Sequence, residues 1–268
     1  MLALTTVSAA LLCTAAPAQD FPSHPVHIMV PWAPGGNVDI TARTLQQAFS
    51  DALGQPVIVD NRAGAGGTIG TAAVVKSAPD SYTLLLGSSG TVTSGAAVFK
   101  NLSYDPLRDL VPVGPIQYVA MVLTAAPKTP VSNFKEYIAL AKSKPGQVNI
   151  ASAGNGSSNH LALELMARQA GLKLVHVPYK GSGPAINDLL GSQVESMMDQ
   201  MTASIEHIRN GRSAALSAAR TPRTLRPGAE RRRDNPEIRR SRARAGNRAV
   251  PAVPRLRPAP RVSGSWPD

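Results

Sequence analysis

Short apolar runs alternate with amphipathic stretches through most of this 268-residue chain. The run at 26–31 (VHIMVP) predicts a buried strand, and an apolar face with helical spacing follows it from Val38 to Leu53. A second strand is predicted at 56–60, after Gly54 ends that helix. The same pattern predicts further strands at 82–86, 116–125, 147–151, 173–178 and 194–199. It predicts further helices from the 64–70 loop to about residue 78 and at 132–144, 157–170, 182–191 and about 203–210.

Alternation of strands and helices at this spacing is typical of βαβ units, and so of mostly parallel sheets covered by helices on both faces. The fold class is therefore α/β. We expect the chain to cross between two lobes at the long strand 116–125, with the first lobe at 19–122 and the second at 123–211. Helix 132–144 is expected to begin with Ser132 as its N-cap.

The net charge of +11 lies entirely at the carboxyl end. Residues 212–268 contain 15 Arg, no Lys and 4 acidic residues, whereas residues 1–211 carry 13 basic and 13 acidic side chains. The charge of the body therefore gives no reason to expect binding to nucleic acid. Aromatic residues make up only 4% of the chain, which argues against a stacking surface for single strands.

The amino terminus is typical of an export signal. Residues 2–16 form an apolar segment, and Ala16-Pro17-Ala18 fits a signal-peptidase site, although basic residues are missing before the apolar segment. We expect a signal peptide at 1–18 and a periplasmic protein; the alternative is a buried first helix. Cleavage there would also remove Cys13, the only cysteine.

The motifs of common enzymes are incomplete. The glycines at 64–70 are spaced GxGxxxG instead of the GxGxxG of dinucleotide-binding loops, and neither a phosphate-binding GxxxxGK[ST] nor a GxSxG nucleophile motif occurs. His24 and His27 alone have a spacing close to that of metal ligands, and solvated side chains explain them better. We predict no catalytic residue, metal or cofactor.

Three loops at predicted strand ends share another composition. Residues 34–37 (PGGN), 87–91 (GSSGT) and 154–160 (GNGSSNH) are rich in small and hydroxyl-bearing residues, and each precedes a helix. The carboxyl edge of a parallel sheet is where ligands bind, and helix N-termini favour anions. Each loop alone could be an ordinary turn; together they predict a shared cleft that holds a carboxylate without Arg or Lys.

Several of these strings resemble one family. FPSHPVHIMVPWAPGGNVDITAR (21–43), LGQPVIVDNRAGAGGTIG (53–70), VNIASAGNGSSNHLALELM (148–166) and HVPYKGSGPAINDLLGSQVESMMDQ (176–200) are similar to the extracytoplasmic solute-binding proteins of tripartite tricarboxylate transporters, the Bug proteins. The similarity covers about 21–211. It implies a type II periplasmic-binding-protein fold whose two lobes close on a small carboxylate. It also implies delivery to a large and a small membrane subunit, with no enzyme activity, no nucleic acid partner and a monomeric chain.

The same resemblance implies which residues contact the ligand. One carboxylate would lie between the PGGN and GNGSSNH loops, with the serine loop as a wall, residues 179–181 closing the cavity, and Asp199 facing the distal group. Trp32 and Asn37 stand where many members carry Phe and Gly, which alters the cavity shape. The ligand-binding residues expected are Pro34, Gly35, Gly36, Asn37, Asp39, Ser88, Ser89, Thr91, Asn155, Gly156, Ser157, Ser158, His160, Tyr179, Lys180, Gly181 and Asp199.

Past residue 211 the resemblance stops. Residues 212–268 contain 15 Arg, 8 Pro and few large apolar residues, a composition typical of a disordered tail. We hypothesise a frameshift near 211–213, which would leave the first lobe without a returning segment, expose apolar sheet surface and impair binding. The alternatives are an Arg-rich arm that binds nucleic acid or anionic membrane, and an accessory protein that presents its ligand to a sensor.

Overall fold

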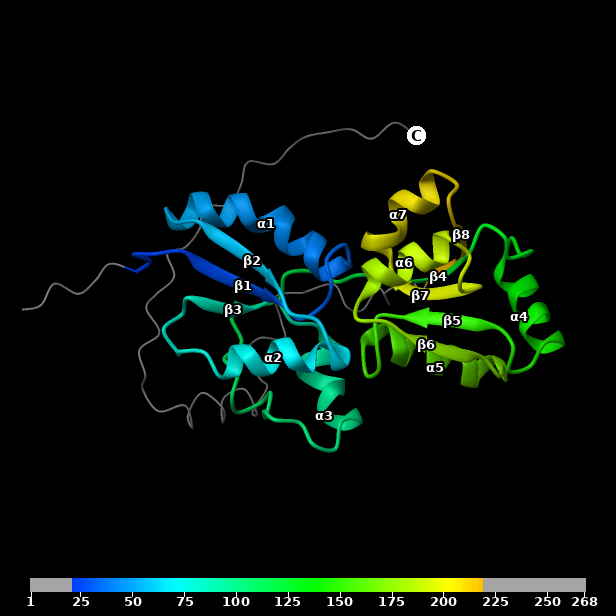
Figure 1. Ribbon diagram of the computed structural model, residues 1–268, viewed down its shortest axis with the longest axis horizontal. Coiled ribbons are helices and arrows are strands. Elements are labelled where there is room, and N and C mark those ends of the chain that lie inside the picture. Colours follow the sequence, from blue (N-terminus) through cyan, green and yellow to red (C-terminus); the bar gives the residue numbers. More distant parts are fainter. Residues whose placement is uncertain (1–20, 219–268) are drawn as a thin grey trace, which may run out of the picture. The chain divides into compact units, whose positions relative to one another are not determined.

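The computed structural model describes residues 21–218, which form two α/β lobes, each built on its own sheet (Figure 1). The predicted signal peptide and most of the Arg-rich tail lie outside the described residues. Along residues 21–218, no helix is both long enough and apolar enough to cross a membrane.

The first lobe is a parallel three-stranded sheet. Its central strand β1 (Val26–Val30) lies between β2 (Val57–Asn61) and β3 (Thr83–Leu85). Helix α1 (Asn37–Leu53) packs its apolar face on β1 and β2 and ends at Gly54, whose φ of 65° is the left-handed conformation of a helix C-cap. Helix α2 is shorter, Thr68–Val75. The crossover order of the strands brings the loops after β1 and β3 to the same edge of the sheet.

Three short elements of this lobe were not predicted from the pattern of apolar residues. They are the 3-10 turn η1 (Ala65–Gly67), the π-helical turn η2 (Gly90–Ser94) and α3 (Gly95–Val98). A hydrogen bond from the Tyr104 hydroxyl to the carbonyl of Thr91 anchors η2 from a distant part of the chain (3.0 Å). Short turns of this kind lack a repeating apolar face, so periodicity does not reveal them.

The second lobe contains a five-stranded mixed sheet in the order β6-β5-β7-β4-β8. Strand β5 is parallel to β6 and β7, and β4 is antiparallel to β7 and β8. The expectation of mostly parallel sheets is therefore confirmed, with β4 as the strand that runs the other way. The five strands are β4 (Met121–Ala125), β5 (Asn149–Ser152), β6 (Val175–Pro178), β7 (Ser196–Gln200) and β8 (Ala214–Ala218).

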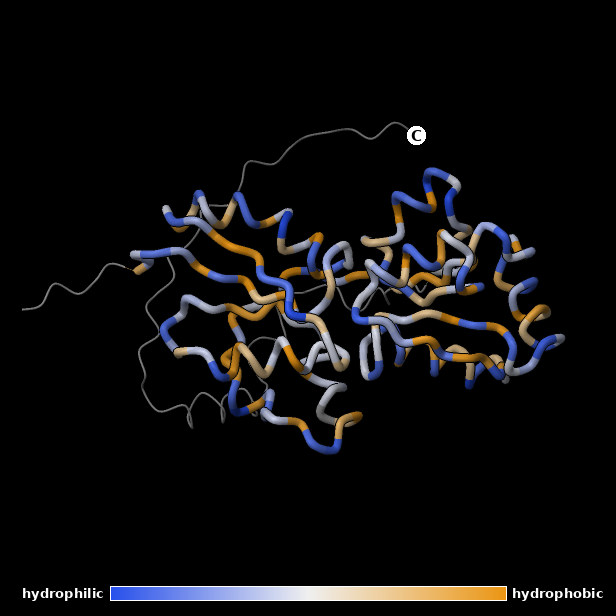
Figure 2. Tube along the Cα trace, viewed as in Figure 1, coloured by the Kyte–Doolittle hydropathy of each residue, from blue (hydrophilic) through white to orange (hydrophobic). Residues whose placement is uncertain are grey.

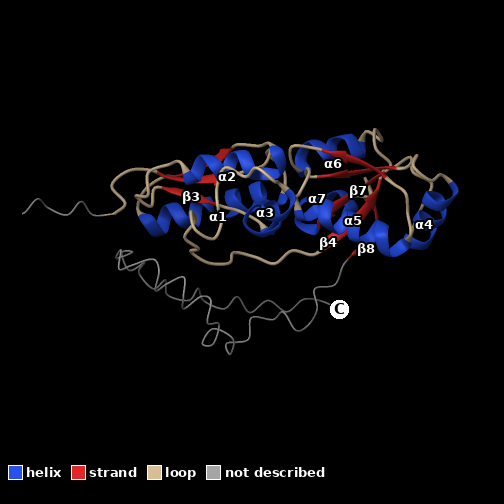
Figure 3. Ribbon diagram, turned by 90° about the horizontal axis from the view of Figure 1, so that it is seen from below, coloured by secondary structure: helices blue, strands red, loops and turns tan. Residues whose placement is uncertain are grey.

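Helices cover both faces of this sheet (Figure 3). Neighbouring residues of a strand point to opposite faces, so Ile150 packs with α4 and α5 whereas Ala151 packs with α6. Along these helices apolar positions recur between hydrophilic ones, as an amphipathic helix requires (Figure 2). The helices are α4 (Phe134–Ser143), α5 (Ser158–Ala170), α6 (Ser182–Leu190) and α7 (Met201–Arg209).

Helix α4 begins at Phe134, and its N-cap lies one residue after the predicted one. Asn133, not Ser132, is the N-cap, since its side chain accepts a hydrogen bond from the N–H of Glu136 (3.0 Å). The Glu136 carboxylate in turn accepts from the N–H of Ser132 (2.7 Å). This arrangement resembles a capping box, with the second bond shifted to the residue before the N-cap, and the two bonds fix the start of the helix more strongly than the residue type at 132 does.

The predicted strand 116–125 is formed only in its second half. Strand β4 begins at Met121, which pairs with Gln200, the last residue of β7, so residues 116–120 have no partner strand among the described residues. Ile116 and Tyr118 are exposed. Exposed apolar side chains thus gather along the connection 107–118, where Leu107 is 90% exposed, and Ile58 of β2 in the first-lobe sheet is exposed as well.

Residues 214–218 form β8, although the sequence analysis assigned them to the tail. The strand pairs antiparallel with β4 and completes one edge of the five-stranded sheet. Leu216 is only 7% exposed and packs in the same core cluster as Leu123 and Tyr137. The second sheet therefore extends beyond residue 211, because strand pairing and one buried leucine outweigh the low apolar content of the segment.

Leu216→Ala tests whether β8 belongs to the cooperative fold. Removal of a buried leucine side chain costs about 2–5 kcal/mol, and we expect the lower end of this range at an edge strand. Ser217→Ala is the matched control, because Ser217 is exposed in the same strand and should change stability by less than about 0.5 kcal/mol. Urea unfolding measures both, and equal effects would show that β8 contributes nothing to the fold.

Candidate functional site

A small cavity lies where the helix starts of the two lobes meet. Its volume is about 20 Å³, which is room for about one water molecule. Any organic acid is larger than this, so a ligand can enter only when the lobes stand further apart. The lining residues are Trp32, Gly36, Asn37, Val38, Asp39 and Ser88 from the first lobe and Ala153, Ser157, Ser158, Asn159, Ser182 and Gln200 from the second.

Helix N-termini supply most of this lining. The lining includes the first residues of α1 and of α5 and the first residue of α6. It also includes Gln200, which immediately precedes α7. The first N–H groups of a helix lack an intrahelical acceptor, and no side chain of the described residues caps α1, whose N-cap is Gly36. The cavity is therefore surrounded by hydrogen-bond donors and by the positive ends of helix dipoles.

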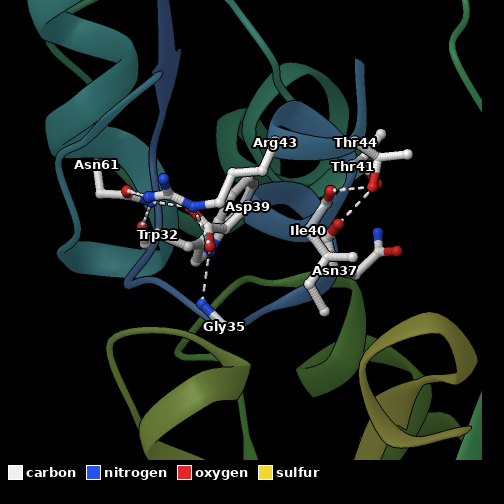
Figure 4. A network of polar contacts seen from close by, with 9 residues as sticks. All are labelled: Trp32, Gly35, Asn37, Asp39, Ile40, Thr41, Arg43, Thr44 and Asn61. Carbon is white, nitrogen blue, oxygen red and sulfur yellow. Dashed lines mark hydrogen bonds and ion pairs between the residues drawn. The ribbon is translucent and has the colours of Figure 1, made fainter. Parts of the chain in front are cut away.

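Asp39 organises the first-lobe half of the site (Figure 4). Its carboxylate accepts hydrogen bonds from the N–H of Gly35 (2.9 Å), from Nε of Arg43 (3.0 Å to each oxygen) and from Nδ2 of Asn61 (2.9 Å). Asn61 Nδ2 also donates to the carbonyl of Trp32 (3.0 Å). These bonds tie the PGGN loop, the first turn of α1 and the end of β2 into one unit.

The surroundings of Asp39 keep it charged and paired. Burial raises its pKa, but the hydrogen bonds from Arg43, Gly35 and Asn61 and the positive charge of Arg43 outweigh burial, so the pKa lies below its usual value. Both carboxylate oxygens are already occupied. Asp39 therefore lines the cavity as a support for the loop, and Arg43 balances its negative charge.

Asp199 plays the corresponding part in the second lobe. It is fully buried at the end of β7, and its carboxylate accepts hydrogen bonds from the hydroxyls of Ser182 (2.6 Å) and Ser204 and from Nδ2 of Asn159 (3.2 Å). Burial raises its pKa, and the hydrogen bonds oppose that shift. Because these partners come from α5, α6 and α7, one side chain holds three helix starts in register.

A histidine pair supports the loop before α5. The rings of His160 and His176 stack with centroids 4.2 Å apart. His160 Nδ1 accepts a hydrogen bond from the N–H of Gly156 (3.1 Å), and His176 Nε2 lies 2.7 Å from the hydroxyl of Ser152. Burial and the neighbouring His160 lower the pKa of His176, while Glu164 opposes this. Through these two hydrogen bonds both rings support the loop.

The structure brings six of the expected ligand-binding residues to the cavity wall: Gly36, Asn37, Asp39, Ser88, Ser157 and Ser158. The remaining eleven are not among the lining residues. For example, the Tyr179 hydroxyl donates to Asp188 (2.7 Å), and buried Thr91 holds the serine loop through the carbonyl of Ser88 (3.0 Å). The eleven are Pro34, Gly35, Ser89, Thr91, Asn155, Gly156, His160, Tyr179, Lys180, Gly181 and Asp199.

Six lining residues are not among the expected ligand-binding residues, although Trp32 was expected to affect the shape of the cavity. Ser182 follows a glycine and opens a helix, which is the signal used for the other loops, and that signal could have found it. Trp32 is 6% exposed, and among the described residues its Nε1–H has no hydrogen-bond partner. Asn159 lies within the GNGSSNH loop that was expected to hold the ligand, whereas nothing in the sequence indicates that Val38, Ala153 and Gln200 reach the same cavity.

Two α/β lobes that meet over a cavity of helix starts define a periplasmic solute-binding protein fold. The family model of the tripartite tricarboxylate transporter family receptor matches residues 41–229. BugT of Bordetella pertussis is 43% identical over 227 residues, which is 84% of this chain and 70% of BugT. The chain belongs to this family of solute-binding receptors, which is not a family of enzymes.

Solved structures agree with this assignment. The periplasmic binding protein BugD is 37% identical, with a TM-score of 0.73 over 76% of this chain and 68% of BugD. MatC from Rhodopseudomonas palustris, solved with bound malate, is 33% identical, with a TM-score of 0.71 over 75% of this chain and 68% of MatC. A further relative, from Pseudomonas sp. strain P51, is matched over only 58% of its length. The family match also continues beyond residue 211, where the sequence analysis ended the resemblance.

The shifted pKa of His176 predicts a dependence of stability on pH. In the unfolded chain His176 binds a proton near its usual pKa of 6.5, whereas in the folded protein its pKa is lower. The stability contributed by neutral His176 is therefore complete above pH 6.5 and is lost as pH falls through the folded pKa. His176→Asn should flatten the fall in unfolding free energy between about pH 7 and 5.

Urea titrations at a series of pH values measure that slope. His24→Asn is the control, because His24 is exposed and stacks only on Tyr82. We expect the control to keep the wild-type slope. A His176→Asn slope equal to that of the wild type would contradict the assignment.

Proposed function

We propose that this chain is the extracytoplasmic receptor of a tripartite tricarboxylate transporter and captures a small carboxylate, that is, a di- or tricarboxylate or related organic acid, by closing its two lobes around it. It would act in the periplasm and deliver the ligand to a large and a small membrane subunit. The observation that carries the proposal is the convergence of helix N-termini from both lobes on one cavity. Malate bound to the relative MatC supports a carboxylate as the ligand.

The charges around the cavity favour this class of ligand. No Lys or Arg is among the residues that line it within the described chain, so an anion would be held by N–H groups and hydroxyls. Hydrogen bonds to a charged group contribute about 1.5–3 kcal/mol each, which makes a few such donors sufficient. The two acidic residues nearby do not compete, because their oxygens already accept several hydrogen bonds.

We assign direct contact with the ligand to the first turn of α1 and to serine hydroxyls. Asn37 and Val38 would donate N–H groups, and Ser88 of the first lobe and Ser158 of the second would donate hydroxyls, because the hydroxyl hydrogens of Ser157 and Ser182 are already donated to Gly154 and Asp199. The unpaired Nε1–H of Trp32 adds a further donor next to the cavity. Residues that do not line the cavity, including Asp199 and His160, would hold these donors in place.

Thermal unfolding in the presence of acids tests the proposal. We expect malate, succinate or adipate to raise the Tm, by about 5–10 °C at a concentration of about 100 times Kd. Dimethyl malate is the matched control, because it keeps the carbon skeleton and lacks both charges. No shift with any di- or tricarboxylate, together with retention of DNA in a gel shift at physiological salt, would instead favour a basic interaction protein.

Comparison of Asn37→Pro with Asn37→Ala measures how much the backbone N–H of residue 37 contributes to ligand binding, apart from its side chain. Proline is tolerated at the first position of a helix, and Gly36 before it is extended (φ −85°, ψ 168°), so α1 should still form. The substitution removes only one N–H group beyond what Asn37→Ala removes. We expect Asn37→Pro to bind the stabilising acid about 10–100-fold more weakly than Asn37→Ala. Calorimetric titration measures both, and equal affinities would rule out this donor.

A further inference from the structure

The lobes touch beyond the cavity as well as around it. The N–H of Ala33 in the first lobe donates to the carbonyl of Lys180 in the second (3.0 Å). On the other side, the hydroxyls of Ser89 and Ser158 lie 2.9 Å apart. These contacts hold the described closed arrangement, and they must part when the cavity opens to admit a ligand.

A third contact, which we call the Gly66 seam, joins η1 and Phe99 of the first lobe to residues 154–156 of the second. A Cβ placed on Gly66 would lie 2.0 Å from the carbonyl oxygen of Asn155. A Cβ on Gly156 would lie 2.8 Å from the ring of Phe99. The two backbones approach so closely that the seam has no space for a side chain on either glycine.

The backbone conformation of Gly66 does not by itself explain the glycine. Its φ of +62° is left-handed, but Gly54 and Gly171 have nearly the same φ, +65° and +64°. A Cβ on either of those two glycines would meet nothing within 4 Å. Gly66 therefore differs from them in its contact with the opposite lobe. An alanine at any of the three positions would have nearly the same backbone strain, but only at Gly66 would its Cβ meet the other lobe.

We propose that Gly66 is a positioning residue for lobe closure, although it does not line the ligand cavity. Its missing Cβ lets η1 rest on the carbonyl of Asn155, and any side chain there would hold the lobes apart. The carbonyl belongs to the backbone, so no change of rotamer in the second lobe can make room. This role rests on the proposed function only in that ligand capture requires closure.

Closure and affinity are linked. When closure around the bound ligand becomes less favourable, the apparent affinity falls by up to the factor by which the closing equilibrium changes. Insertion of a methyl group against a rigid backbone is costly, so we expect Gly66→Ala to weaken malate binding about 10-fold or more relative to Gly54→Ala. Gly171→Ala, in the second lobe, should match Gly54→Ala.

A second measurement follows closure without any ligand. In a Cys13→Ser chain, Ser89→Cys and Ser158→Cys place two thiols across the lobes at positions whose hydroxyls lie 2.9 Å apart. The initial rate of disulfide formation between them reports how often the lobes close. We expect this rate to fall about 10-fold when Gly66→Ala is added, because the closed state is then less populated. Gly54→Ala should leave the rate unchanged.

The two measurements separate the possible outcomes. Slower cross-linking in Gly66→Ala supports the inference even if malate binds no variant, in which case malate as the proposed ligand is what fails. Cross-linking rates equal to those of Gly54→Ala overturn the inference, and the proposed function stands if the wild type still binds malate.

Circular dichroism and unfolding curves would show whether Gly66→Ala folds. If it does not, a second variant tests the same contact. Gly156→Ala then brings a Cβ against the Phe99 ring from the other side of the seam. Phe99→Ala is its compensating change, because it removes the ring. Recovery of the cross-linking rate in the double variant supports the seam, and no recovery contradicts it.

Discussion

Unpaired N–H groups at helix starts are the constraint on which this site depends. A buried backbone donor must find an acceptor, and the first turn of a helix offers three or four donors that the helix itself cannot satisfy. Here α1, α5 and α6 all begin at the same cavity, and Gly36 supplies no side chain that could cap α1. An anion can accept hydrogen bonds from several such donors at once, so this arrangement favours a negatively charged ligand whatever the shape of the rest of the ligand.

Two buried carboxylates make that convergence rigid. Asp39 ties α1 to the loop before it and to β2, and Asp199 ties together the starts of α5, α6 and α7. Each accepts hydrogen bonds at both of its oxygens, which offsets the cost of burying a carboxyl group. Both acidic residues were expected to face the ligand. In the structure Asp39 lines the cavity and Asp199 is not among the lining residues, and both accept hydrogen bonds from the protein itself.

Some features of the fold could be predicted because they depend on local pattern. The apolar run at 26–31 and the helix starting near Val38 need only neighbouring residues to specify them, and both formed within a residue or two. The start of α4 and the length of β4 depended on partners: hydrogen bonds with Glu136, and the last residue of β7. Strand β8 formed from Ala-rich sequence because β4 offered an unpaired edge.

The sequence by itself determined the α/β class, the loops at the strand ends and the expectation that an anion binds there. These follow from periodicity and residue type, which act over a few residues. Only the tertiary structure decided which loop residues face the cavity, that Asn159, Ser182 and Gln200 join them, and that Gly66 must lack a side chain. Those facts depend on distances between segments about 90 residues apart, as between Gly66 and Asn155, and such distances are set by packing and not by local pattern.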